Sequence, residues 1–395
     1  MNSLKSLGQA FKVPEIRKKI IFTVLMLIIY RLGSCIPVPN IDRSVLSDYF
    51  SGASGLFGLF DMFSGGSFRN FTIFALSITP YVTASIILQL LTVVIPRLEA
   101  LSKEGTEGRK KIAQYTRYLT VVLALVQSIG LTVGLFRSAV VDQTFFSIAV
   151  IVITLTAGTA FLMWLGEQIN EHGIGNGISL IIMAGIVARM PSAIHQAFVK
   201  LQEGTVSIIS IIIFAIFAIA VIVGIIEVQQ GTRKIPVQYA KRVVGRKMYG
   251  GQNTHIPLKV NQAGVIPVIF SLSILQFPLT ITYFTNSASG FTQFVTKYLS
   301  PSGTPGVWIY SVLNIVLIIF FTYFYTAITF NPVEVADNMK ANGGFIPGIR
   351  PGRCTVEYLS RVMTRITFAG AIFLAVIATL PTILGRFTDL GIEFG

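Results

Sequence analysis

This chain is short of charged residues. Only 12% of its 395 residues are Asp, Glu, Lys or Arg, whereas soluble domains carry about 25%. Hydrophobic residues make up 53% and the mean hydropathy is +0.71, which excludes an ordinary soluble domain. Runs of about 20 apolar residues are long enough to cross a bilayer as helix. Nine such windows lie at about 20–37, 71–95, 118–136, 145–165, 177–194, 207–226, 263–283, 307–330 and 366–384. The sequence therefore predicts an all-α polytopic membrane protein.

Charge is also missing from the interiors of these windows. Arg31 is the main exception, and Glu167 and Glu227 fall at the predicted cytoplasmic ends. Transporters that couple to ions or protons need groups inside the bilayer that titrate or coordinate. This absence therefore disfavours a pump or a symporter. A hydrophobically gated conduit or a passive scaffold remains.

Cysteine and histidine are scarce as well. Cys35 is predicted near the outer end of the first span and Cys354 in a cytoplasmic loop, so the two cannot form a bridge. His172, His195 and His255 fall in three different loops, without the spacing of metal ligands or of a catalytic group. No nucleotide-binding loop is present. We expect no enzyme activity, no cofactor and no metal, so that a partner must supply the energy for any transport. An intramembrane protease, which needs its catalytic groups within the spans, fits poorly.

The basic residues are distributed unevenly. The net charge is +14, and most of the 31 Lys and Arg lie at the N-terminus and in the loops 97–117, 228–260 and 331–365. The positive-inside rule places all four in the cytoplasm. Residues 1–19 then form a cytoplasmic amphipathic lead-in, and no cleaved signal peptide is expected. Nine spans leave the C-terminus outside, and we expect a further span to be absent from this chain.

A weak internal repeat joins the second window to the seventh. Eleven residues from Pro80 resemble eleven from Pro267. The matching pairs are Pro80/Pro267, Val82/Ile269, Ala84/Ser271, Ile87/Ile274, Leu88/Leu275 and Gln89/Gln276. An odd offset in spans inverts the membrane orientation, which is the pattern of an inverted-topology repeat whose halves meet at a functional axis. The proline near each start predicts a helix that begins part-way into the membrane.

The segment 51–70 precedes the second span and has an unusual composition. Its short apolar core, Leu56 to Phe63, is surrounded by Gly and Ser. The core is too short to span a bilayer and too apolar for a simple loop. We predict a re-entrant segment in the mouth of the protein. A turn that lies in the membrane interface is the alternative.

The loop Gly343–Gly352 is rich in Gly and Pro and carries Arg350. These residues prevent helix formation and favour turns, so the loop should hold Arg350 at a fixed tip. Together with the basic loop 228–260, it suggests a docking surface for a large partner. An ordinary inter-helix connection is the alternative. The nearby cations are Lys340, Arg353, Arg361 and Arg365.

Several ordered motifs are spread over the whole chain: ITPY (78–81), SII (85–87), QLLT (89–92), EG (104–105), GRKK (108–111), QYTRY (114–118), GIGNGIS (173–179), YAKR (239–242), PLKVN (257–261), AGVIP (263–267) and PGIRPG (347–352). In these motifs the chain resembles the SecY family, the channel subunits of the bacterial protein translocase. The resemblance implies two pseudo-symmetric halves of five spans each. The halves would be 20–194, with the re-entrant segment 51–70, and 195–395, with the loops 228–260 and 331–365. The tenth span of the family is expected to be missing from this sequence, which departs from the pattern, so the pore residue of that span is not assigned here.

The resemblance also implies roles for particular residues. An aliphatic ring that closes the pore by dewetting would include Ile78, Val82, Ile186 and Ile269. Routine core- or lipid-facing positions are the alternative for these four. The family's plug, which closes the outer funnel, would comprise Leu56, Phe57, Leu59, Phe60, Met62 and Phe63.

The resemblance further implies a lateral gate between spans two/three and seven/eight, where signal sequences and membrane helices leave into lipid. Its polar candidates are Thr83, Ser85, Gln127 and Asn261, although ordinary helix–helix contacts are the alternative. Arg246, Lys247 and Arg350 match positions that dock the SecA motor and the ribosome. The expected partners also include SecE, SecG and membrane lipid. The expected location is the bacterial cytoplasmic membrane, with a plastid membrane as the alternative.

Overall fold

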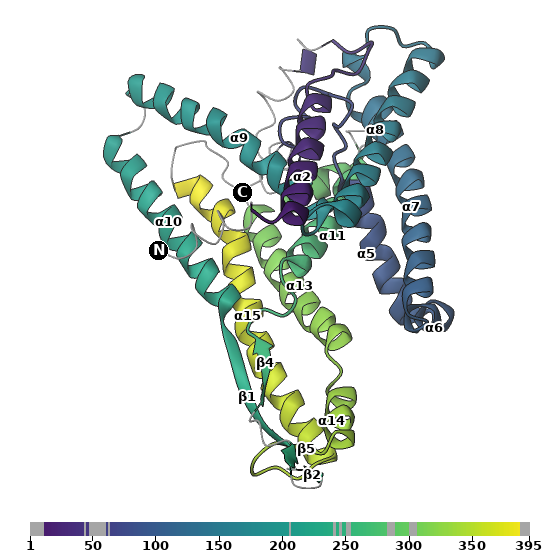
Figure 1. Cartoon of the computed structure of the whole chain (residues 1–395). Helices are drawn as coiled ribbons and strands as arrows, with labels where there is room; N and C mark the ends of the chain where they lie inside the picture. The colour runs from purple at the N-terminus through teal and green to yellow at the C-terminus, as the bar shows by residue number, and fades with distance from the viewer. Residues whose placement is uncertain are drawn as a thin grey trace. The chain divides into compact units, whose positions relative to one another are not determined.

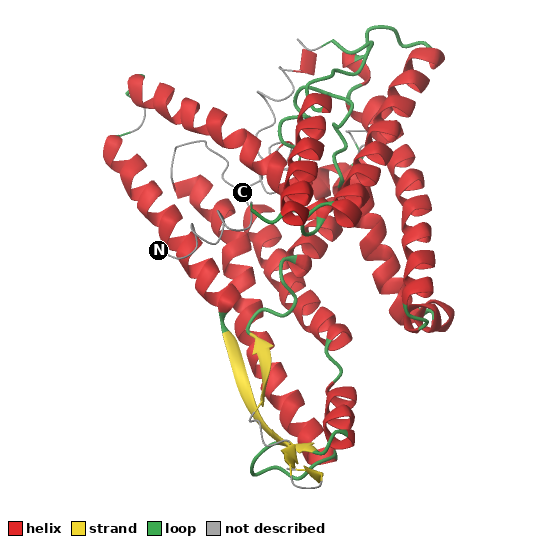
Figure 2. Ribbon diagram, in the orientation of Figure 1, coloured by secondary structure: helices red, strands yellow, loops and turns green. Residues whose placement is uncertain are grey.

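The structure is a computed structural model, and it describes residues 12–42, 45–46, 61, 64–204, 207–239, 242–244, 247–249, 254–282, 289–299 and 306–387. Most of these residues are helical (Figures 1 and 2). The helices are α2 (Pro14–Gly33), α5 (Thr79–Val94), α6 (Pro96–Lys103), α7 (Thr106–Ile129), the π-helix η1 (Gly130–Leu135), the 3-10 helix η2 (Arg137–Ala139), α8 (Phe145–His172), α9 (Gly177–Gln202), α10 (Ile208–Gln230), α11 (Ile266–Thr282), α12 (Gly290–Tyr298), α13 (Gly306–Thr329), α14 (Pro332–Ala341) and α15 (Arg353–Phe387). The strands are β1 (Thr232–Tyr239), β2 (Arg242–Val244), β3 (Lys247–Tyr249), β4 (Thr254–Lys259) and β5 (Gly344–Phe345).

The prediction of an all-α polytopic membrane protein is confirmed, and each of the nine predicted windows overlaps a helix. Within the described residues, six helices are long and apolar enough to cross a membrane, or up to seven if the bent pair α5 and α6 forms one span. The window at α11 is a shorter apolar helix. The helix α2, at the first predicted window, is not one of these six. Its first turns carry charged residues, including Glu15 and Arg17.

The predicted start of the second span at residue 71 is wrong. Residues 73–78 form turns and the helix α5 begins only at Thr79. Phe71 and Ser77 have φ angles of 44° and 53°, in the left-handed region that ends regular helix. The helix α5 begins one residue before Pro80 and α11 one residue before Pro267, so a proline stands in the first turn of each helix. The depth of these two helix starts in the membrane stays a prediction. Proline suits the first helical turn, where its missing N–H would have no partner.

The helices α5 and α6 meet at a bend of 101°. Ile95 between them is extended, with φ −99° and ψ 112°. The pyrrolidine ring of Pro96 disfavours helical backbone at the residue before it, which explains the break. The basic loop predicted at 97–117 therefore consists of α6 and the first turns of α7.

The described residues fall into two compact units. Unit 1 draws on Met1–Val199 and Gln276–Val307, and unit 2 on Lys200–Leu275 and Trp308–Gly391. In unit 1, α7 lies beside both α5 and α8, and α2 packs against α8. Among the residues between α2 and α5, one isolated bridge joins Pro37 to Thr72, and a second joins Ile41 to Val140, which follows η2.

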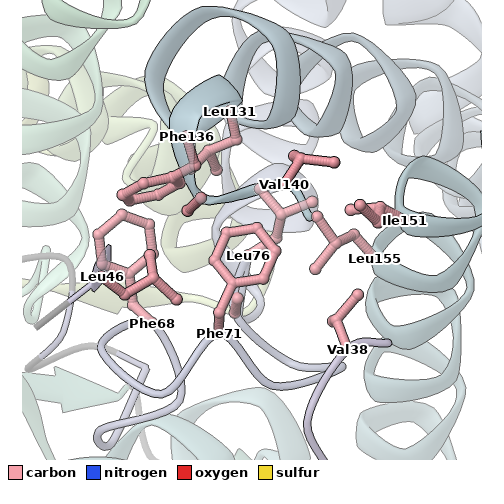
Figure 3. Packing of buried hydrophobic residues seen from close by; sticks show 12 residues of the cluster. Val38, Leu46, Phe68, Phe71, Leu76, Leu131, Phe136, Val140, Ile151 and Leu155 are labelled. Atoms are coloured by element: carbon pink, nitrogen blue, oxygen red, sulfur yellow. The ribbon is translucent and has the colours of Figure 1, made fainter. Parts of the chain in front are cut away.

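The first core of unit 1 combines side chains of the segment between α2 and α5 with side chains from η1 to α8 (Figure 3). Phe71 and Phe136 meet edge to face with ring centroids 5.3 Å apart, a favourable arrangement of two aromatic quadrupoles. The buried members are Val38, Leu46, Phe68, Phe71, Ala75, Leu76, Leu131, Phe136, Ala139, Val140, Ile151 and Leu155. This core fixes the chain that leads into α5.

The connection from α8 to α9 contains the glycine-rich motif 173–179. The side chain of Asn176 accepts hydrogen bonds from the amides of Ile178 and Ser179 and so caps α9. A Cβ at Gly177 would overlap the carbonyl oxygen of Gly166, so glycine permits the close approach of α9 to α8. The hydroxyl of Thr23 on α2 accepts a hydrogen bond from the amide of Ile174.

Unit 2 combines helices with a small sheet of order β4-β1-β5. Strand β1 continues from α10 after Gly231, and it pairs antiparallel with β4 from Thr232↔Lys259 to Val237↔Thr254. The side chains of Ile235 and Val237 alternate into a core that includes Leu359, Val362 and Met363 of α15. The sheet and α14 therefore pack on the first half of α15 (Figures 1 and 2).

Candidate functional site

The predicted pore residues Ile78 and Val82 lie at the start of α5. Ile78 is the N-cap residue, and its carbonyl accepts a hydrogen bond from the Val82 amide at 3.1 Å. Ile78 is 2% exposed, Val82 is partly buried, and both pack in one apolar cluster with Leu162, Leu165 and Ile169 of α8 and Ile181 of α9. The shared face predicted for the two residues is therefore present.

The other two predicted pore residues lie elsewhere. Ile186 is partly exposed on α9, in unit 1. Ile269 is partly buried on α11, in unit 2, next to Val268 of the cluster formed by Ile318, Leu374 and Ala375. Because the four residues are divided between the two units, their assembly into one ring stays a prediction.

The predicted plug residues, Leu56, Phe57, Leu59, Phe60, Met62 and Phe63, lie outside the described residues. The C-terminal end of the predicted re-entrant segment is described. Residues 64–70 form successive turns, and Asp61 before them is buried. The carboxylate of Asp61 accepts a hydrogen bond from the Arg69 amide at 2.8 Å. Its other oxygen lies 2.9 Å from Nη1 of Arg189 on α9.

The electrostatics of Asp61 follow from this burial. The side chain of Asp61 is 4% exposed, and that of Arg189 is 33% exposed. Burial raises the pKa of the Asp61 carboxyl above its ordinary value, while the Arg69 amide and the charges of Arg189 and Arg69 lower it. The raised pKa means that loss of hydration outweighs these favourable contacts. Sequence reasoning did not find this pair, although an acid within the apolar core of 56–63 was a visible signal.

The candidate gate residues are divided between the two units. The hydroxyl of Thr83 donates to the Thr79 carbonyl within α5. Ser85 and Gln127 are partly buried in unit 1. Asn261 is 5% exposed in unit 2, and its amide donates to the Gly264 carbonyl, while its Oδ1 has no hydrogen-bond partner in the described part of the chain.

Two polar contacts between helices were not foreseen from the sequence. The hydroxyls of Ser128 on α7 and Thr156 on α8 lie 3.3 Å apart. Ser271 on α11 donates to the side chain of Asn314 on α13 at 2.6 Å, and both are buried. The signal was present in the sequence, because buried polar side chains within apolar helices usually pair across helices.

The two predicted basic loops are parts of one structure in unit 2. Strand β1 from the first loop pairs with β5 from the second, through Gln238↔Phe345 and Tyr239↔Gly344. Arg350 is exposed in the turn that follows β5, and Gly348 and Gly352 on either side have φ angles of 81° and 103°. The expected Gly/Pro-enforced turns are confirmed. Arg246 lies outside the described residues, and Lys247 belongs to β3, which pairs with β2.

The sequence model of the SecY family matches residues 72–395. The chain belongs to the SecY family. Among curated relatives, the protein translocase subunit SecY of Streptomyces coelicolor is 50% identical over 394 residues, a match that covers 96% of this chain and 89% of that protein. The SecY subunit of Corynebacterium glutamicum is 47% identical over 408 residues, which covers 99% of this chain and 91% of that protein.

Solved structures confirm the SecY fold. A structure described as a protein-conducting channel has a TM-score of 0.62 at 21% identity, with 98% of this chain and 96% of that chain covered. A second SecY structure matches equally well, and its description states that the plug domain stabilises the closed state and maintains a membrane seal. Sec61 from a canine ribosome–channel complex has a TM-score of 0.60 at 20% identity, with the same coverage of both chains.

Proposed function

We propose that this SecY-family chain forms the protein-conducting channel of a Sec translocase. It passes unfolded secretory polypeptides across the membrane and releases signal sequences and membrane helices through a lateral gate. The observation that carries this proposal is the aliphatic pair Ile78 and Val82 at the start of α5, in a family of translocase subunits. The chain performs no catalysis in this proposal, and the driving energy comes from a partner.

The chemistry of the proposed ring suits a substrate of any sequence. Aliphatic side chains exclude water and ions from a narrow passage by dewetting, yet they yield around a passing chain. Charged side chains at the same positions would bind some segments and repel others. The four ring residues, Ile78, Val82, Ile186 and Ile269, are all uncharged and branched. The plug segment around Leu56 to Phe63 closes the outer funnel at rest.

The proposed gate relies on polar contacts of moderate strength. A polar pair within a membrane contributes roughly 0.6–2 kcal/mol. A few such contacts, which include Thr83, Ser85, Gln127 and Asn261, would keep the gate shut and still allow a signal helix to displace them. The unpaired Oδ1 of Asn261 supports this role, because it can accept a hydrogen bond from an incoming segment.

The basic surface on unit 2 is the proposed docking site for the SecA motor and the ribosome. Its members Arg246, Lys247 and Arg350 would contact ribosomal RNA phosphates, with an affinity that falls as salt rises. The pairing of β1 with β5 supports a single surface, because it connects the two loops that carry these residues. SecE and SecG are the proposed membrane partners. The proposed location is the bacterial cytoplasmic membrane, with the N-terminus in the cytoplasm.

Disulfide crosslinking tests the channel. Val82→Cys and Ile269→Cys are made singly in a background that lacks Cys35 and Cys354, and each is assembled into the complete translocase. A secretory chain with one cysteine is stalled midway across the membrane. We expect crosslinks from both positions to the middle of the stalled chain. Phe277→Cys on α11, which is 63% exposed, is the matched control.

Crosslinks from both ring positions and none from the Phe277 control would support a pore lined by these residues. If the control reacts and neither ring position does, the ring assignment is wrong. A passive scaffold then becomes the better reading.

A further inference from the structure

Among ion pairs that join described residues, Asp61 with Arg189 contains the most buried acid. The Asp61 side chain is 4% exposed, whereas the acids of the other pairs are between 21% and 72% exposed. A charge so well buried requires a compensating charge, and Arg189 supplies it at 2.9 Å. The pair connects two segments of unit 1 that are distant in sequence, the turns before α5 and the helix α9.

The same two segments also touch through glycines. Gly65 has a φ angle of 65°, and a Cβ at this position would lie 2.8 Å from the Cα of Gly185 on α9. Gly185 and Arg189 are one turn apart, so they share a face of α9. The turns 64–70 therefore pack on one short stretch of α9. Ile186, a proposed ring residue, lies within this stretch.

A third contact joins these turns to α2. Nη1 of Arg31 on α2 donates a hydrogen bond to the Gly65 carbonyl at 3.1 Å. Arg31 is the main charged residue inside a predicted span, and its side chain makes this hydrogen bond. The turns 64–70 thus contact both α2 and α9 through Gly65. They lead directly through residues 71–77 to Ile78 at the start of α5.

We propose that the Asp61–Arg189 pair is a charge-compensated latch that keeps the turns 64–70 on α9 while the channel is at rest. This proposal rests on the proposed channel function and adds the residues that set its resting state. Removal of Arg189 alone would leave an uncompensated carboxylate in a buried site, which strongly disfavours the latched arrangement. The equilibrium then shifts toward arrangements in which Asp61 reaches water.

The protonation of Asp61 gives the latch a distinctive signature. The groups that face the carboxyl are the guanidinium of Arg189 on α9 and the amide and charge of Arg69, and Arg31 of α2 contacts the adjoining Gly65. Burial raises the pKa of Asp61 in the latched state, so this state binds the proton more tightly than an open state in which Asp61 is hydrated. Low pH therefore favours the latched state, most strongly when Arg189 is absent.

The test uses the complete translocase in sealed vesicles, with the resting leak of a small entrapped dye as the readout. Arg189→Gln is expected to raise the leak at neutral pH by about tenfold or more. Acidification should reverse this leak. The double variant Asp61→Asn with Arg189→Gln should leak close to the wild-type rate, because neither charge remains. Arg189→Lys should leak only slightly more than the wild type, because lysine keeps the positive charge.

Lys103→Gln breaks an exposed ion pair with Glu99 and is the matched control, for which no change in leak is expected. If Arg189→Gln leaks like the wild type, or if the double variant leaks as much as the single one, the latch is refuted. Translocation of a secretory protein is measured in the same vesicles. A wild-type complex that moves no polypeptide would contradict the channel function, whereas normal translocation with an unaltered leak would contradict the latch alone.

Discussion

Ser271 on α11 donates a 2.6 Å hydrogen bond to the side chain of Asn314 on α13, and both residues are buried in unit 2. Asn314 is 3% exposed and Ser271 is fully buried. Next to this bond, Phe270 of α11 meets Phe321 of α13 edge to face at 5.4 Å. The bond therefore joins the helix that carries Ile269 to its neighbour in the same unit.

Loss of this bond should weaken the association of the two helices. We expect Asn314→Leu to destabilise the protein by roughly 0.6–2 kcal/mol, the range for hydrogen bonds between membrane helices. Thermal unfolding of the purified complex in detergent measures the effect. Thr329→Ala, which removes an exposed hydroxyl at the end of α13, is the control and should change little. Additive effects of Ser271→Ala and Asn314→Leu in the double variant would argue against a shared bond.

A second prediction concerns the close approach of α8 to the turns before α5. A Cβ at Gly158 would overlap the carbonyl oxygen of Ile73, and Phe74 lies 3.4 Å away. Gly158→Ala should therefore cost about 1–3 kcal/mol through overpacking, despite the better helix propensity of alanine. Gly224→Ala on α10 has open space around the new methyl group and is the matched control. Its expected effect is a small gain in thermal stability. Equal stabilities of the two variants would contradict this packing.

A third prediction tests the docking surface. Arg350 is exposed in a turn that two glycines with positive φ hold in shape. Arg350→Glu should weaken ribosome binding to vesicles that contain the translocase. It should also reduce the salt dependence of that binding by about one unit of slope in a logarithmic plot, because one phosphate contact is lost.

The control for this experiment is Lys297→Glu on α12, which lies on the opposite side of the membrane by the charge rule. Binding that falls equally in both variants would indicate a loss of net charge, without a defined site.

A fourth prediction concerns the joint between the two basic loops. A Cβ at Gly344 would lie 2.8 Å from the ring of Tyr239, its partner in the β1–β5 pair. Gly344→Val should therefore loosen this pairing and lower the affinity for docked partners, although no charge changes. Hydrogen exchange at the Tyr239 and Phe345 amides would report the loosening. Unaltered exchange in this variant would contradict the pairing as the element that unites the loops.

The sequence was sufficient for features that depend on local composition. The length of the apolar windows alone predicts a helical membrane protein and the approximate position of nine helices. A segment in lipid must form its backbone hydrogen bonds internally, which a helix does. The prolines at 80 and 267 predict where α5 and α11 begin. The glycines of 343–352 predict turns, because glycine adopts the positive φ angles of turns without steric cost, and Gly343, Gly348 and Gly352 have such angles.

Sequence reasoning did less well where the outcome depends on partners. It placed the second span eight residues too early, because apolar residues 71–78 can form a helix or pack as turns in a core. Residues 73–78 form turns because Phe71 and its neighbours pack in the core with Phe136 and Ile151. For the gate, it chose Thr83, whose hydroxyl bonds within its own helix, and it did not select Ser271 or Asn314.

The sequence by itself determined the membrane class, the family and the helix windows of this protein, because each follows from the residues within one window or one motif. Only the tertiary structure decided that Asp61 meets Arg189, that Arg31 holds Gly65, and that β1 pairs with β5. These contacts join residues far apart in the chain. A pattern of hydrophobicity or charge names the residues that need partners, but packing chooses the partner each one receives.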